Sequence, residues 1–138
     1  MKRMWMILLV AVTVACGGGV DHDAMKNKVL DAHDEVMPKM GEVMNLKKKV
    51  IARAGELEAE DSTNEKIAEL RDLAKDLEGA YQGMMNWMRA WSENSDPYTS
   101  GQAKPDEITA FYEAEQEKID KVKADINGSI DKAKKVLQ

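Results

Sequence analysis

Methionine and histidine side chains recur in two short segments of this chain. On a helix, His33, Met37 and Met40 fall within about 60° of one another. If the chain folds back at the polar stretch near residues 60 and 61, positions whose numbers sum to about 121 lie opposite each other. The segment with His33, Met37 and Met40 then faces the segment with Met84 and Met88. Thioether and imidazole groups are ligands that suit Cu(I). The candidate ligands of such a copper-binding layer are His33, Met37, Met40, Met84 and Met88.

The same methionines also fit a purely structural role. Pro38 predicts a kink or a break near Met37, because its ring removes one backbone hydrogen bond and presses on the preceding turn. Flexible methionine side chains fill irregular space of this kind and make favourable contacts with aromatic rings. A spacing of three and four is also what any buried helix face produces. Core packing is therefore the favoured interpretation, and a periplasmic copper-binding protein is the alternative.

Cys16, the only cysteine, follows a basic start and an unbroken apolar run from Met4 to Ala15. This is the pattern of an export signal, and the run is too short to span a bilayer, which takes about 20 residues. The segment 12–16 resembles the bacterial lipobox, in which the cysteine becomes the acylated N-terminus. The sequence predicts a cleaved signal peptide over 1–15 and a lipidated cysteine with a glycine tether over 16–20. An ordinary signal peptide followed by a free thiol is the alternative.

A second group of residues is a candidate surface for a protein partner. Trp87 lies about 100° from the centre of the apolar stripe of its helix, beside Met85 and Arg89. An exposed tryptophan in that setting is typical of an interface anchor. Filling a wide buried face explains Trp87 equally well.

The sequence offers no catalytic constellation. His22-Asp23 and His33-Asp34 are eleven residues apart on one helix, about 16 Å, which is too far for both pairs to hold one ion. The chain also lacks a Gly-rich phosphate loop, a Cys-x-x-Cys pair and a Gly-x-Ser-x-Gly elbow. Its net charge of −5 becomes more negative once Lys2 and Arg3 leave with the leader, so nucleic acid is an unsuitable partner. We therefore expect a protein that is not an enzyme and has no cofactor, apart from the copper alternative.

The composition and the apolar spacing predict an all-α fold. Apolar residues recur at threes and fours over 21–59, 62–92 and 105–137, which predicts three long helices in one domain over 21–138. Ser62-Thr63-Asn64-Glu65 predicts a capping box at the start of the second helix, and Pro105 opens the third. The connections are too short to cross the length of a helix, so the helices should form an antiparallel, up-down-up three-helix bundle.

Two segments carry a family resemblance: His33-Asp34-Glu35-Val36-Met37-Pro38-Lys39-Met40-Gly41-Glu42 and Met84-Met85-Asn86-Trp87-Met88-Arg89. Together with the lipobox, they resemble a family of small uncharacterised lipoproteins of Bacteroidota, sometimes labelled viral A-type inclusion-like. The resemblance implies a helical protein anchored to the membrane of the cell envelope by its lipid, and it implies no activity. Gly17 after the cysteine favours the outer membrane. We expect a binding or scaffolding role toward an unidentified envelope protein, with self-association as a further expectation.

Overall fold

The computed structural model describes residues 18–138, and this part of the chain is entirely helical apart from its turns. The elements are α1 (His22–Val36), the 3₁₀ segment η1 (Met37–Lys39), α2 (Met40–Glu60), α3 (Lys66–Asn94), α4 (Asp96–Thr99) and α5 (Pro105–Val136). No strand occurs in the range described, so the all-α prediction is confirmed. The predicted signal peptide and Cys16 lie outside the described residues.

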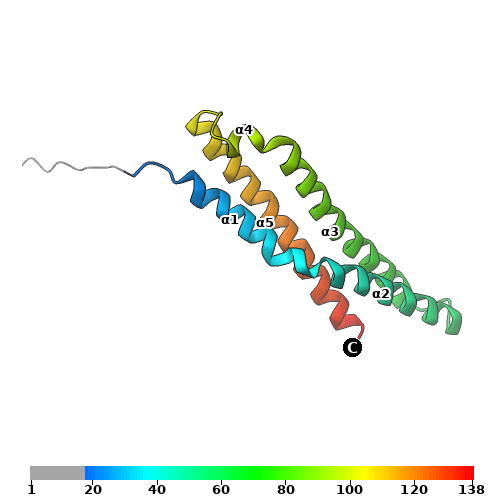
Figure 1. Cartoon of the computed structure of the whole chain (residues 1–138). Coiled ribbons are helices and arrows are strands. Elements are labelled where there is room, and N and C mark those ends of the chain that lie inside the picture. The colour runs from blue at the N-terminus through cyan, green and yellow to red at the C-terminus, as the bar shows by residue number, and fades with distance from the viewer. Residues whose placement is uncertain (1–17) are drawn as a thin grey trace, which may run out of the picture.

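Figure 1 shows how these elements lie in space. α1, η1 and α2 follow one another as a bent rod, and α3 runs back along α2. α5 packs against α1, α3 and part of α2. The first described residues, α4 and the start of α5 lie at one end, where His22 Nε2 is 2.9 Å from Thr109 Oγ1. The α2–α3 turn lies at the other end, and α5 stops short of it.

Pro38 divides the first rod into two helices. The residues Met37–Lys39 form a 3₁₀ turn, and the Met40 backbone N–H donates to the Met37 carbonyl. A proline has no N–H to donate and its ring crowds the preceding turn, so a tighter turn replaces the regular helix here. The interruption predicted from the proline is thus present. It lets α1 lie along α5 while α2 lies along α3.

The capping box predicted at Ser62 is wrong. α3 begins at Lys66, four residues later, because the turn is organised by Asp61 and Asn64 instead. The Asp61 carboxylate accepts the backbone N–H of Thr63 at 3.0 Å and its hydroxyl at 2.7 Å, and Asn64 Oδ1 accepts the Lys66 N–H at 3.0 Å. Short Asp and Asn side chains compete for backbone donors in this way and hold a turn where a helix would otherwise continue.

The second connection is shorter than the gap between the helices predicted over 62–92 and 105–137, and part of it is helical. α3 continues to Asn94, the short helix α4 follows, and the chain then turns at Gly101 with φ +74°. A left-handed φ of this kind favours glycine, which has no Cβ to clash. α5 begins at Pro105, as predicted, and the Glu107 carboxylate accepts the Lys104 N–H at 3.1 Å.

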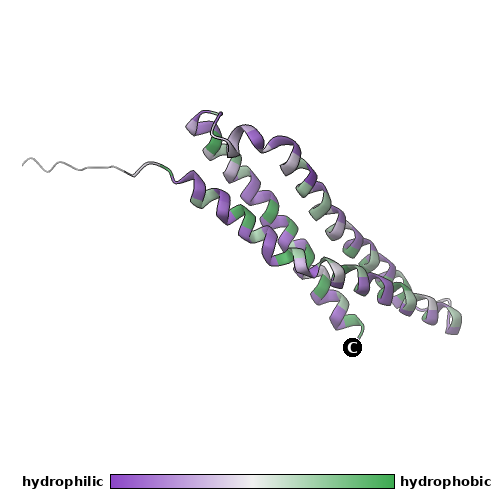
Figure 2. Cartoon of the chain, in the orientation of Figure 1, coloured by the Kyte–Doolittle hydropathy of each residue, from purple (hydrophilic) through white to green (hydrophobic). Residues whose placement is uncertain are grey.

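One continuous apolar core joins the long helices. The helices α1, α2, α3 and α5 each bury a set of hydrophobic residues, and Figure 2 shows hydrophobic and hydrophilic residues alternating along their ribbons. This is the arrangement expected for amphipathic helices that must bury one face. The largest side chains with essentially no exposure are Leu70, Leu77, Met84, Ile119, Ile126, Val29, Val36, Val43 and Val50.

Candidate functional site

The proposed lipidation site lies just before the described residues. The Asp21 carboxylate caps α1 by accepting the Ala24 N–H at 3.0 Å, and the helix begins at His22, the sixth residue after Cys16. The helical body therefore starts almost directly after the predicted tether. An anchor on Cys16 would therefore lie close to the end of the body that carries α4 and the start of α5.

The residues of the predicted copper-binding layer all lie on or in the core. Met84 is fully buried and Met40 is 6% exposed, while Met37 and Met88 are half-buried and pack against the core. His33 lies beside them, with its Nδ1 2.8 Å from the Asp34 carboxylate and its ring against Trp87. The His33–Trp87 contact places the two segments close to the predicted register. Each methionine also has the apolar surroundings that core packing requires.

Trp87 is not the exposed anchor that the sequence suggested. It is 6% exposed and belongs to the core, while Met85 is half-buried and Arg89 is exposed. The Trp87 ring lies against His33 of α1 and against Trp91, so the buried face of α3 extends beyond the stripe centred on Leu77 and Met84. The alternative of filling a wide face describes Trp87 correctly.

Aromatic rings form a connected series at the end of the body that carries residue 18. The Trp87 ring lies 5.6 Å from His33 and 5.4 Å from Trp91, between ring centroids. Trp91 lies 5.7 Å from Phe111, which stacks on Tyr98 of α4 at 4.0 Å and an interplanar angle of 3°. Such contacts add to the stability that burial alone provides. The series joins α1, α3, α4 and α5 at this end.

Glu115 is the residue that the sequence reasoning missed. It lies in α5 at 5% exposure; Lys118 Nζ donates to its Oε1 at 2.6 Å, and its buried Oε2 has no hydrogen-bond partner. The buried Trp87 Nε1 also lacks an acceptor. A signal was present in the sequence, because the apolar stripe of the third helix skips from Phe111 to Ile119 and Glu115 fills the vacant position. Buried carboxylates without full pairing are costly and are concentrated at functional sites.

Glu115 lines a cavity of about 440 Å³ between the end of α3, α4 and α5. The stacked rings of Tyr98 and Phe111 form part of its wall, and Glu93 and Lys118 add one charge of each sign. The volume lies within the range of small-molecule sites. We refer to it below as the Glu115 cavity.

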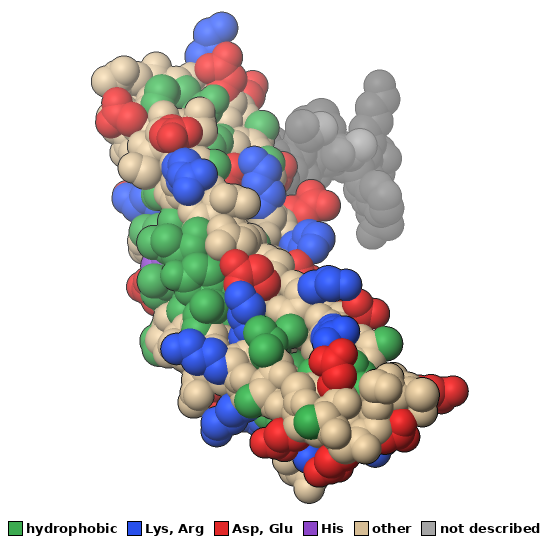
Figure 3. Space-filling view, turned by 90° about the vertical axis from the view of Figure 1, so that its right-hand side faces the viewer, with side chains coloured by type: hydrophobic (Ala, Val, Ile, Leu, Met, Phe, Trp, Pro, Cys, Tyr) green, Lys and Arg blue, Asp and Glu red, His purple; other side chains and the backbone are tan. Residues whose placement is uncertain are grey.

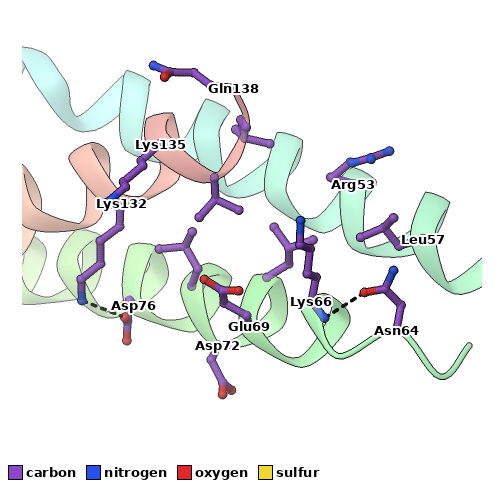
Figure 4. A pocket seen from close by; sticks show the side chains of 14 residues that line it. Arg53, Leu57, Asn64, Lys66, Glu69, Asp72, Asp76, Lys132, Lys135 and Gln138 are labelled. Atoms are coloured by element: carbon purple, nitrogen blue, oxygen red, sulfur yellow. Dashed lines mark hydrogen bonds and ion pairs between the residues drawn. The ribbon is translucent and has the colours of Figure 1, made fainter.

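A larger groove of about 1180 Å³ lies toward the opposite end, where α5 stops and the α2–α3 hairpin continues. Leu57, Leu70, Leu73 and Leu137 supply apolar lining. Figure 4 shows charged side chains around them, with cations from α5, α2 and the first residue of α3, and acids from α3. Lys132 Nζ and Asp76 form an ion pair at 3.8 Å across the groove. The charged lining residues are Arg53, Lys66, Glu69, Asp72, Asp76, Lys132 and Lys135.

Figure 3 shows acidic and basic side chains intermixed on one face, around a patch of hydrophobic side chains. Ion pairs cross between helices, and they lower carboxyl pKa values: the Lys123 ammonium does so for Glu35, and Lys47 together with Gln82 does so for Glu78. Burial raises the pKa of the Tyr112 hydroxyl. These shifts belong to interhelical contacts and do not assemble a reactive centre.

Comparisons with protein-family models, curated proteins and solved structures find no match to this chain. Within residues 18–138, no group of three or more His, Cys, Asp or Glu side chains is arranged to hold a metal ion. None of the helices in this range has both the length and the hydropathy to cross a membrane.

Proposed function

We propose that this chain is a lipoprotein of the bacterial cell envelope, anchored through Cys16, that binds or scaffolds another envelope protein and catalyses no reaction. Support comes from the export-like leader, the small residues before Cys16 and the start of α1 six residues later. A linker of that length reaches at most about 20 Å at about 3.5 Å per residue. The helical body is thereby kept beside the membrane that holds the lipid, which we assign to the outer membrane.

We infer that the body is an up-down-up bundle whose three legs are the α1–η1–α2 rod, α3 and α5. Ion pairs support this arrangement. The pairs Glu35–Lys123 and Glu42–Lys134 join the first leg to α5, and both residue numbers rise from one pair to the next, as in parallel helices. The pairs Lys47–Glu78 and Glu58–Arg71 join α2 to α3, and one number rises while the other falls, as in antiparallel helices.

The observation that carries the binding role is the groove beside the end of α5. It lies toward the end of the body away from the tether, so it faces away from the membrane in the anchored protein. An apolar floor between charged rims is the setting in which an amphipathic helix docks through its apolar face. The acids on α3 and the cations on α5 would pair with opposite charges on the two flanks of such a helix.

Lipidation is tested by metabolic labelling with a fatty-acid probe. The unaltered chain should incorporate the label, and the Cys16→Ala chain should not, because no other thiol is present to accept the acyl group. Label retained on Cys16→Ala would refute the lipoprotein assignment.

Partner binding is tested with the intact lipoprotein as bait in detergent-solubilised envelopes. Val136 is 36% exposed and lines the groove, whereas Ile51 is 50% exposed and lies outside it. Val136→Glu should reduce recovery of the captured partner, and the matched Ile51→Glu variant should leave it unchanged. Equal recovery from both variants would place the partner elsewhere on the molecule.

A further inference from the structure

We propose that the Glu115 cavity binds a primary ammonium group, with the Glu115 carboxylate as its acceptor and the Tyr98–Phe111 ring pair as its wall. The free form of this chemistry is a small amine. A lipid headgroup that ends in an ammonium, as in phosphatidylethanolamine, is the other source, and that source rests on the lipid anchor proposed above.

The Glu115 carboxylate is held by one exposed donor. Its Oε1 accepts from Lys118 at 2.6 Å, and its Oε2 is closed to solvent and has no hydrogen-bond partner. A buried carboxylate that lacks donors is unfavourable, and charge-assisted hydrogen bonds are the strongest available remedy. An ammonium ligand in the cavity would bind this carboxylate at Oε1, in place of the exposed Lys118 ammonium.

The charges around the cavity favour a cation. Glu93 and Glu115 contribute two carboxylates and Lys118 one ammonium, which leaves one negative charge unbalanced. Lys118 is 61% exposed and holds Glu115 from the next helical turn. Such an exposed side chain is weakly held. It is also an internal example of the proposed ligand, because its ammonium already binds this carboxylate.

The aromatic wall adds a second element of recognition. Tyr98 and Phe111 stack face to face at 4.0 Å and line the same cavity as Glu115. Aromatic faces attract ammonium groups, most strongly where water is partly excluded. A buried acid beside stacked rings is therefore suited to an organic ammonium with a short carbon chain.

The position of the cavity brings a lipid headgroup within reach. His22 contacts Thr109 of α5, and Glu115 lies six residues further along that helix, about 9 Å. The cavity therefore belongs to the end of the body that follows the short tether. A headgroup in the same membrane surface as the anchor can approach it.

The test is a titration of the purified full chain in detergent with ethanolamine, followed by tryptophan fluorescence. Glu115→Gln should weaken binding by about tenfold or more, as expected for loss of a hydrogen bond between charged groups. Glu117→Gln, which changes an exposed acid two residues away, should bind like the unaltered chain. Equal ethanolamine affinity of Glu115→Gln and the unaltered chain, or no binding by the unaltered chain, would overturn the proposal.

Two further measurements complete the test. Lys118→Gln frees Glu115 Oε1 and should tighten ethanolamine binding. Weaker binding by this variant would overturn the proposed site. The variant also serves as the test if Glu115→Gln fails to fold.

Vesicles with and without phosphatidylethanolamine then distinguish the lipid headgroup from a free amine as the ligand. Preference for that lipid, lost in Glu115→Gln, supports the headgroup, whereas ethanolamine binding without a lipid preference supports a free amine. The ethanolamine titration does not depend on acylation, so its outcome is independent of the Cys16 labelling result.

Discussion

Truncating Ile126 to alanine tests the assignment of the core, and Ile51→Ala provides a matched control. Both changes remove the same three carbon atoms from an isoleucine in the middle of a helix. Ile126 is fully buried, whereas Ile51 is 50% exposed. The Lys39 ammonium donates to Asn127 at 2.7 Å, so Ile126 lies at the level of the η1 interruption, between the first leg and the rest of the core.

The expected magnitude follows from burial. Removing three buried carbons costs about 0.8 kcal/mol each in transfer free energy, and the cavity that remains adds to this. We expect Ile126→Ala to lower the free energy of unfolding by about 2–5 kcal/mol and Ile51→Ala by less than about 1 kcal/mol.

Urea unfolding followed by circular dichroism measures the difference directly. With a slope of about 1–3 kcal/mol per molar urea, the Ile126→Ala midpoint should fall by on the order of 1–2 M. The Ile51→Ala midpoint should stay close to that of the unaltered protein. If Ile51→Ala were as damaging as Ile126→Ala, the inward face of the helices would be wrongly assigned.

Three more predictions follow from local features. Because contacts lower the pKa values of Glu35, Asp61 and Glu78 below their ordinary values of 4.5, 3.8 and 4.5, their stabilising contribution is present above those values. It is lost as the pH falls further, so Glu78→Gln should make acid unfolding less steep. Gly101→Ala, at φ +74°, should cost about 1 kcal/mol, whereas Gly55→Ala in α2, where an added Cβ meets nothing within 4 Å, should stabilise the chain in thermal melts by about 0.5–1 kcal/mol. Micromolar Cu(I) should not raise the melting temperature if the methionines serve only to pack the core; a clear rise would favour the copper alternative.

The helices could be predicted from the sequence because their apolar spacing is regular. Leu70, Leu77 and Met84 recur at sevens, and this spacing alone identifies the inner face of α3. The proline interruption was equally predictable, since the missing N–H is a property of the residue itself. Such features depend on a few neighbouring residues, which a sequence displays completely.

Features set by competition or by a third element could not be predicted. Asp61 and Asn64 hold the turn by accepting from Thr63 and Lys66, so the helix begins after the Ser62 capping box, and the spacing does not indicate which cap prevails. The burial of Trp87 involves its contact with His33 of α1, which no single-helix pattern contains. The position of Glu115 was visible as a gap in the apolar stripe, but its burial arises where α5 meets α3 and α4, which the stripe does not contain.

The contacts of α1 have a consequence for the order in which the chain folds. α2 and α3 form a local hairpin whose ion pairs join residues 13 and 31 positions apart. The contacts of α1 and η1 with α5 join residues 87 and 88 positions apart. Closing the larger loop costs more chain entropy, so we expect the hairpin to form first and α1 to dock only once α5 is complete. On a chain that leaves the ribosome or the export channel from its N-terminus, the segment nearest the anchor is then the last to become ordered.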